Sequence, residues 1–344
     1  MLIHLTPGRF VNANQYTTLV CDALDQAGGK TENLTPKSVF ARPDIVHVHW
    51  PEFALADSWH RAVLRTARLF TRVWMLKLLG AKLFWTAHNV RPHERKHPAL
   101  ERLVYKIWCK MVDGVFFLSK SSERLVVEAY PQLEKKPRFI TPHGDYAPLM
   151  FKQKTREEVR RELGIPEDAL VIGNMGSMRP YKNLVALCEA FREMADDNTW
   201  LFISGQCPDP SLREAITKAA DGHPRIRLNF NEMSNEEIEN YTRTCSVMVF
   251  PYTDILNSGS LLFALTVGAR SMAPAIGSLP ELQSDVGEDW VHLYEGDFGP
   301  EILRKALAWS ATPTREPAPN LENYDWGRIG HLMMDAYRQV SRKS

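Results

Sequence analysis

Two polar loops in the second half of the chain carry residue types that bind anions. Each loop follows an apolar run with strand character, 170–175 or 247–250, and precedes a segment with helical spacing. Free backbone amides at the start of a helix, with Arg and Lys beside them, favour binding of a diphosphate. The ordinary alternative is that Ser and Asn cap the helices and that the basic pair lies in an exposed turn. The residues concerned are Gly176, Arg179, Lys182, Asn257, Ser258, Gly259 and Ser260.

Histidines and carboxylates follow two apolar runs of the first half. Glu52 ends the sequence HVHWPE, and His88, Asn89 and Glu94 lie in the sequence HNVRPHE. Such groups are costly to bury unpaired, so their position at strand ends favours a chemical role over a packing role. A zinc site is disfavoured because no histidine pair has the helical HExxH spacing, and no metal is expected.

The segment 59–79 has the pattern of a basic amphipathic helix. Its Trp and Leu residues, Trp74 among them, alternate with a stripe of arginines. Residues 1–150 hold 21 Lys and Arg against 13 Asp and Glu, and residues 151–344 hold 21 against 28. This asymmetry favours contact of the first half with an anionic membrane surface, although an ordinary solvated helix face has the same pattern. The stripe consists of Arg61, Arg65, Arg68 and Arg72.

The elements that must position these residues alternate between strands and helices, as in parallel α/β proteins. Short apolar runs alternate with amphipathic segments up to residue 140, pause at 146–154 and then resume. The pattern predicts two Rossmann-like domains, 1–150 and 151–325, followed by a helix over 326–344. Ligands of such sheets bind beyond the carboxyl ends of the strands, where the loops above lie.

Composition narrows the class of protein. The chain is 44% hydrophobic and 24% charged, as in ordinary globular proteins. We expect no secretory signal and no membrane span, since Lys77 and Lys82 interrupt the best apolar stretch. Five scattered cysteines without CxxC spacing favour a reducing cytoplasm. No zinc-finger or RNP motif is present, so nucleic acid is not an expected partner.

Over essentially its whole length the chain resembles a GT-B glycosyltransferase. It looks like the family typified by the xanthan β-mannosyltransferase, which extends a polyprenyl-diphosphate-linked oligosaccharide with mannose from GDP-mannose in exopolysaccharide synthesis. The resemblance implies an acceptor-binding first domain, a nucleotide-sugar-binding second domain and a last helix that packs back toward the first. It also implies peripheral attachment to the cytoplasmic face of the inner membrane. The motifs that carry it are HVHWPE, HNVRPHE, RPYK, LNSGSLLFAL, DVGEDWVHLYEGDF and APNLENYDWGRIG.

The resemblance also suggests roles for individual residues. Guanine is expected near Phe230 and Asn231, and His88 and Asn89 near the donor. The base that activates the acceptor is expected to be Glu94, with Glu52 second and Asp145 third. Arg179, Lys182 and backbone amides would act on the diphosphate in place of a metal.

One feature of the broader retaining family is missing. The two glutamates that such enzymes carry eight positions apart would fall on Phe263 and on or beside Asp254 and Ile255. We therefore expect an inverting transferase. The alternatives are another donor such as UDP-glucuronate, a GT-B sugar-nucleotide epimerase, and a non-catalytic scaffold.

Overall fold

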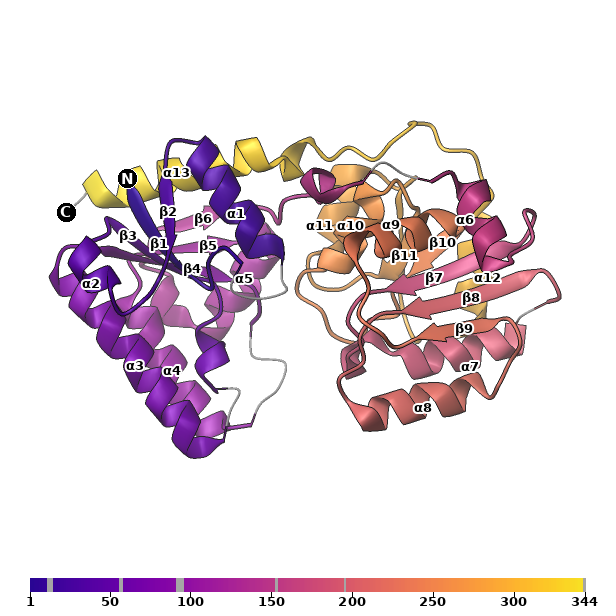
Figure 1. Ribbon diagram of the computed structural model, residues 1–344, viewed down its shortest axis with the longest axis horizontal. Helices are drawn as coiled ribbons and strands as arrows, with labels where there is room; N and C mark the ends of the chain where they lie inside the picture. The colour runs from indigo at the N-terminus through magenta and orange to yellow at the C-terminus, as the bar shows by residue number, and fades with distance from the viewer. Residues whose placement is uncertain (11–14, 56–57, 91–95, 152–153, 195, 343–344) are drawn as a thin grey trace. The chain divides into compact units, whose positions relative to one another are not determined.

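The computed structural model divides the chain into two compact units. It describes residues 1–344 except 11–14, 56–57, 91–95, 152–153, 195 and 343–344 (Figure 1). The first unit combines Met1–Gly144 with Asn323–Ser344, and the second is Asp145–Glu322. The chain thus passes from the first unit to the second after residue 144, and its last residues return to the first.

The first unit contains a six-stranded parallel sheet in the order β2-β1-β3-β4-β5-β6. Figure 1 shows α1 and α13 on one face of this sheet and α3 and α4 on the other. The strands are β1 (Leu2–Thr6), β2 (Lys30–Asn33), β3 (Ile45–Val48), β4 (Lys82–Ala87), β5 (Gly114–Phe117) and β6 (Arg138–Ile140). The helices are α1 (Gln15–Gln26), α2 (Ser38–Ala41), α3 (Trp59–Leu78), α4 (Pro98–Met111), α5 (Lys120–Ala129) and α13 (Trp326–Arg342).

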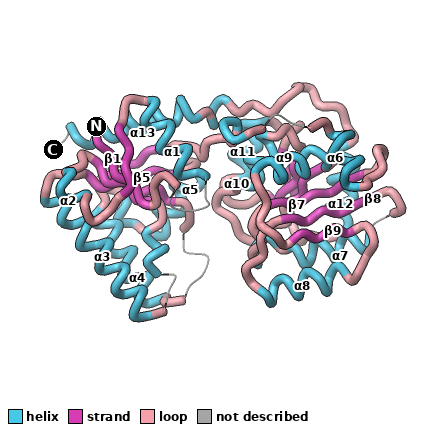
Figure 2. The backbone as a smooth tube through the Cα atoms, viewed as in Figure 1, coloured by secondary structure: helices cyan, strands magenta, loops and turns pink. Residues whose placement is uncertain are grey.

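The second unit contains another six-stranded parallel sheet, in the order β12-β11-β10-β7-β8-β9. Figure 2 shows β7, β8 and β9 of this sheet side by side. The strands are β7 (Leu170–Met175), β8 (Thr199–Ser204), β9 (Ile226–Asn229), β10 (Val247–Val249), β11 (Ser271–Pro274) and β12 (Val291–Tyr294). The helices are α6 (Arg156–Leu163), α7 (Leu184–Met194), α8 (Pro210–Ala220), α9 (Asn235–Thr244), α10 (Gly259–Thr266), α11 (Leu279–Val286) and α12 (Pro300–Ser310). The predicted α/β class with two parallel sheets is confirmed.

The strand orders decide where ligands can bind. In each sheet the first strand along the chain lies inside, so the direction of winding reverses beside it. The reversal lies between β1 and β3 in the first unit and between β7 and β10 in the second. At such a switch point the loops after the two strands diverge and leave a crevice, which is where ligands of doubly wound sheets bind.

The last helix completes the core of the first unit. Its buried side chains recur every three or four residues, from Trp326 to Val340, as expected for one apolar face of a helix. The face packs against α1. Gly330 lies so close to α1 that a Cβ atom there would be 2.3 Å from the carbonyl oxygen of Ala23. The Tyr337 hydroxyl lies 2.6 Å from His47 Nδ1 on β3.

We expect Gly330→Ala to lower the thermal midpoint of the first unit. The added methyl forces α13 away from α1, and overpacking of this kind costs about 1–3 kcal/mol. The matched control is Gly327→Ala on the same helix, where the new Cβ would meet only the end of the Asp325 side chain, at 3.1 Å. Calorimetry should show the control unchanged or more stable, because Ala is the better helix former. Equal midpoints for the two variants would contradict close packing at Gly330.

Candidate functional site

The two loops of the second unit that the sequence predicts to bind an anion follow β7 and β10, the strands on either side of its switch point. Lys182, at the end of a 3₁₀ turn (Pro180–Lys182), is only 4% exposed. Its Nζ donates to Ser260 Oγ, 3.3 Å away, in the first turn of α10. The two loops are therefore in direct contact, and the lysine of the first loop lies at the N-terminus of the helix that follows the second.

Burial, and secondarily the neighbouring Arg179 guanidinium, lower the pKa of Lys182 to about 8. An ammonium group in this position is poorly solvated and gains a great deal from an anionic partner. Arg179 itself is half-buried at the start of the 3₁₀ turn. The two cations together favour binding of a group with more than one negative charge.

Two glycines allow the loops to approach each other. Gly176 has a φ of +103°, and a Cβ atom there would lie 2.9 Å from Ser260 Oγ and 3.3 Å from Lys182 Nζ. Gly205, after β8, has a φ of +142°, and its Cβ would lie 2.3 Å from the Gly176 carbonyl oxygen. Only glycine fits either position, because L side chains rarely adopt such φ values and there is no space for them.

The start of α10 has the helix cap that was one of the two alternatives for this loop. Ser258 is the N-cap, and its Oγ accepts a hydrogen bond from the Leu261 N–H at 3.1 Å. The buried Tyr252 hydroxyl lies 2.7 Å from the same Oγ. Asn257 and Gly259 are half-buried beside it. Ser258 thus caps the helix, while Ser260 points to the lysine.

Tyr252 was not among the predicted site residues. It lies in the loop three residues after β10 and contacts Ser258 from there. In the sequence, a tyrosine directly after an apolar run is typical of a core residue. Its hydroxyl, not its ring, is what gives it a place in the site.

Phe230 and Asn231 lie beyond β9, at the edge of the sheet rather than at the switch point. The Arg213 guanidinium lies 4.8 Å from the centre of the Phe230 ring, which also packs against the core of the unit. Asn231 is exposed, and its N–H donates to Asn229 Oδ1 at 3.1 Å. The predicted base-binding pair is therefore placed at the carboxyl edge of the sheet but two strands away from the lysine loop.

In the first unit, Glu52 lies directly after β3, in the 3₁₀ turn Pro51–Leu55. Its Oε2 accepts a hydrogen bond from the Tyr105 hydroxyl at 3.0 Å, and the Asn89 side chain also donates to the carboxylate. Burial outweighs these hydrogen bonds and raises the pKa of Glu52 to about 7. Glu52 is thus a carboxyl group that changes its charge near neutral pH, at the carboxyl end of a strand beside the switch point.

The residues next to Glu52 and Asn89 in the sequence include a group of packed aromatic rings. Trp50 stacks on His88 with ring centroids 4.2 Å apart and on Phe53 with centroids 5.3 Å apart. His88 Nε2 lies 3.3 Å from Nδ1 of the buried His49. The structure therefore brings His88, Asn89 and Glu52 together. Glu94 and His93 lie outside the described residues.

His47 and His49 lie in the interior of the first unit. His47 lies between the Tyr337 hydroxyl, at 2.6 Å, and Thr86 Oγ1, at 2.7 Å. Burial lowers the pKa of His49 to about 3, so its ring is neutral at physiological pH. Within the described parts of the chain no group of three His, Cys, Asp or Glu side chains could hold a metal ion.

Asp145, the third predicted base, is the first residue of the second unit. Its Oδ1 accepts a hydrogen bond from the Ala147 N–H at 3.1 Å, which stabilises the turn there. This gives Asp145 a structural role in the turn that links the units along the chain.

The predicted basic helix is α3. Arg61, Arg65 and Arg68 are exposed, and Arg72 is half-buried. Large apolar side chains are exposed on the same helix, including Trp59, Leu64, Trp74 and Leu78, the last at 67%. No helix among the described residues is both long enough and apolar enough to cross a bilayer.

Comparison with known proteins agrees with this arrangement. Residues 155–256, which include the loop of Lys182 and end just before Asn257, match the family model for glycosyl transferases group 1. The chain is 28% identical over 335 residues to the GDP-mannose:glycolipid 4-beta-D-mannosyltransferase of Xanthomonas campestris pv. campestris, covering 96% of this chain and 90% of the relative.

Two solved structures share the fold over nearly the whole chain. Sucrose-phosphate synthase from Thermosynechococcus elongatus aligns with a TM-score of 0.71 and 16% identity, covering 100% of both chains. Anabaena HepE in complex with UDP-glucose aligns with a TM-score of 0.66 and 13% identity, covering 99% of this chain and 98% of that one. These findings show that residues 155–256 form a group 1 glycosyltransferase domain and that the chain has the GT-B fold.

Proposed function

We propose that the protein transfers mannose from GDP-mannose, with inversion, to a polyprenyl-diphosphate-linked oligosaccharide in exopolysaccharide synthesis. The observation that carries the proposal is the contact between Lys182 and Ser260 at the switch point of the second unit. A buried ammonium at a helix N-terminus suits a diphosphate, the group that leaves in this reaction. The choice of GDP-mannose and of a glycolipid acceptor follows the name of the Xanthomonas relative.

In this proposal the diphosphate is stabilised without a metal. As the bond between the anomeric carbon and the diphosphate oxygen breaks, negative charge builds on that oxygen. Lys182, Arg179 and the amides at the start of α10 offset it. Fixed donors of this kind act on the charge that develops in the transition state and so raise kcat rather than binding alone.

A carboxylate of the first unit is proposed to accept the proton of the attacking hydroxyl group. We favour Glu52, because it follows a strand at the switch point and because its pKa of about 7 makes it a base at neutral pH. Glu94, which the sequence favoured, stays a prediction. The acceptor oxygen then attacks the anomeric carbon from the face opposite the diphosphate, GDP leaves, and the new bond is β.

A retaining route lacks its usual carboxylates here. Phe263, at the position of one family glutamate, is a buried apolar residue of α10, and Asp254 is exposed. The inverting assignment rests on this departure.

The donor and the stereochemistry can be tested together. We expect product from GDP-mannose and a lipid-linked acceptor but not from UDP-glucose, UDP-glucuronate or UDP-N-acetylglucosamine, with the new linkage β by its carbon–proton coupling. Product from UDP-glucuronate but not from GDP-mannose would mean that the donor is UDP-glucuronate. An α-linked product would overturn inversion, product formed without any acceptor would favour an epimerase, and binding of no nucleotide sugar would favour a scaffold.

We also propose that α3 binds the cytoplasmic face of the inner membrane, where a lipid-linked acceptor would lie. The exposed arginines can pair with anionic headgroups while the exposed Trp and Leu side chains enter the boundary with the acyl chains. On an ordinary solvated helix face, side chains such as Trp74 and Leu78 would be unfavourable neighbours of water.

Replacing the four arginines of α3 by Gln should release the protein from anionic liposomes in a sedimentation assay. High salt should do the same to the unchanged protein, because charges at a surface are screened within about 10 Å at 0.1 M ionic strength. A control variant loses the same charge from exposed cations of the second unit and should still sediment with the liposomes. Equal release of both variants would mean that overall charge, not α3, governs binding. The control positions are Arg161, Lys218, Arg304 and Lys305.

A further inference from the structure

The second unit contains a cavity of about 530 Å³ at the end of its sheet opposite the anion-binding loops. Ser246, Arg270 and Trp290 line it, and each immediately precedes a strand: β10, β11 and β12. Because the strands are parallel, these positions mark the amino end of the sheet, whereas Lys182 and Ser260 follow the carboxyl ends. The cavity is therefore separate from the proposed donor site.

The wall of the cavity is strongly basic. Of the described residues that line it, four are cationic and none is a carboxylate. Two of the cations have carboxylate partners behind them: Lys154 pairs with Glu162 at 2.8 Å and Arg243 with Glu239 at 3.0 Å. Arg156 instead donates to the Ser246 hydroxyl at 3.3 Å. The positive charge is thus only partly compensated, which favours an anionic occupant.

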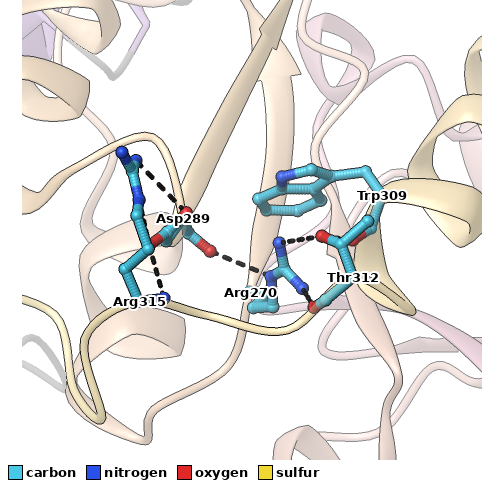
Figure 3. A network of polar contacts seen from close by, with 5 residues as sticks. All are labelled: Arg270, Asp289, Trp309, Thr312 and Arg315. Atoms are coloured by element: carbon cyan, nitrogen blue, oxygen red, sulfur yellow. Dashed lines mark hydrogen bonds and ion pairs between the residues drawn. The ribbon is translucent and has the colours of Figure 1, made fainter.

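The fourth cation, Arg270, is fixed in place (Figure 3). Its guanidinium donates to the Thr312 carbonyl at 2.6 Å and to the Asp289 carbonyl at 2.9 Å, and it lies 4.0 Å from the centre of the Trp309 ring. Arg315 pairs with the Asp289 carboxylate at 3.1 Å on the far side of this network. One wall of the cavity is therefore rigid, and its charge does not depend on a mobile side chain.

The remaining lining suits a ligand with more than charge. The Ser246 and Thr155 hydroxyls add hydrogen-bonding groups, while Val267 and Trp290 add apolar surface. The buried indole N–H of Trp290 has no hydrogen-bond acceptor among the described residues and adds to the positive potential. Cavities of about 300–1,000 Å³ hold molecules the size of a nucleotide or a sugar phosphate.

We propose that this cavity binds a small phosphorylated molecule, with the phosphate at Arg156 and Lys154 and the body of the ligand against Trp290. The site is distinct from the one that holds the donor diphosphate. Its occupant would be a ligand in addition to donor and acceptor. The proposal does not depend on which sugar the enzyme transfers.

The test is isothermal titration calorimetry with AMP and with inorganic pyrophosphate. We expect Lys154→Gln combined with Arg156→Gln to weaken binding of at least one probe by about tenfold or more at this site. Both side chains are exposed, so this variant should fold. Arg179→Ala combined with Lys182→Ala, which disables the proposed donor loops, should leave that binding event in place. Arg161→Gln combined with Lys218→Gln is the control for loss of two charges.

Three results would overturn the proposal. The first is that neither probe binds at millimolar concentration. The second is that the Arg179 and Lys182 variant abolishes all binding, which would place the phosphate at the donor loops. The third is that the cavity variant binds both probes as the unchanged protein does. Failure of the donor assignment would not produce any of these results by itself, so the two proposals fail separately.

Discussion

Lys182→Ala is expected to lower kcat by about 10²–10³-fold, the usual effect of removing one fixed donor from a developing anion. The ammonium is buried against Ser260, so water cannot replace it without cost. The loss should appear in kcat more than in KM, because the charge on the diphosphate grows as the bond breaks. Steady-state kinetics with GDP-mannose and a lipid-linked acceptor measure both values.

The pH profile gives a second readout of Lys182. With a pKa of about 8, the free enzyme loses this cation as the pH rises through 8, so kcat/KM should fall on the alkaline side. That fall should be absent in Lys182→Ala. Arg179→Ala should also be strongly impaired, whereas Asp254→Ala and the exposed control Lys218→Ala should retain activity. Near-normal turnover in both Lys182→Ala and Arg179→Ala would place the diphosphate elsewhere.

Glu52→Gln is expected to reduce transfer by about 10²–10⁴-fold while GDP-mannose still binds, as for loss of a general base. The amide is similar in size and can keep the hydrogen bond from Tyr105, but it cannot accept a proton. In the unchanged enzyme kcat/KM should rise with pH through about 7, because the carboxyl must be ionised to act. The variant should lack this acid limb. Calorimetry with GDP-mannose and single-turnover kinetics separate binding from chemistry.

Tyr105→Phe is the matched variant that keeps the base but alters its surroundings. The tyrosine hydroxyl donates to the Glu52 carboxylate and stabilises its ionised form. Its loss should move the acid limb to higher pH and leave the rate at high pH nearly unchanged, an effect that a purely structural role would not produce. If Glu94→Gln abolishes transfer while Glu52→Gln remains active, Glu94 is the base.

The sequence predicted most strands because buried parallel strands are apolar throughout. The hydrophobic pattern does not mark β2 or β12, each of which lies at an edge of its sheet, where a strand is covered less completely. β2 reads KTEN, a polar sequence that pairing with β1 alone makes a strand. The hydrophobic pattern of the sequence does not identify such a segment as a strand.

For the site, the rule that ligands bind at strand ends was sufficient to select both loops of the second unit. It could not predict which atoms meet: the contact between Lys182 and Ser260 joins residues 78 positions apart. Nor could it predict that Glu52 would keep its proton to near neutral pH, because that depends on how deeply Tyr105 and its neighbours bury the carboxyl group. The positions of residues after strands in the sequence are enough to select the loops, whereas the contacts and the pKa values depend on how the folded chain packs around each side chain.

The return of α13 to the first unit affects the order in which the protein can mature on the ribosome. Domains usually fold in the order of their synthesis, the N-terminal one first. Here the side chains that close the core beside β3, such as Tyr337, are made after the whole of the second unit, Asp145–Glu322. The N-terminal unit can therefore complete its core only after the second unit has been synthesised. A nascent chain stalled before residue 326 would expose the surface of α1 that α13 later covers.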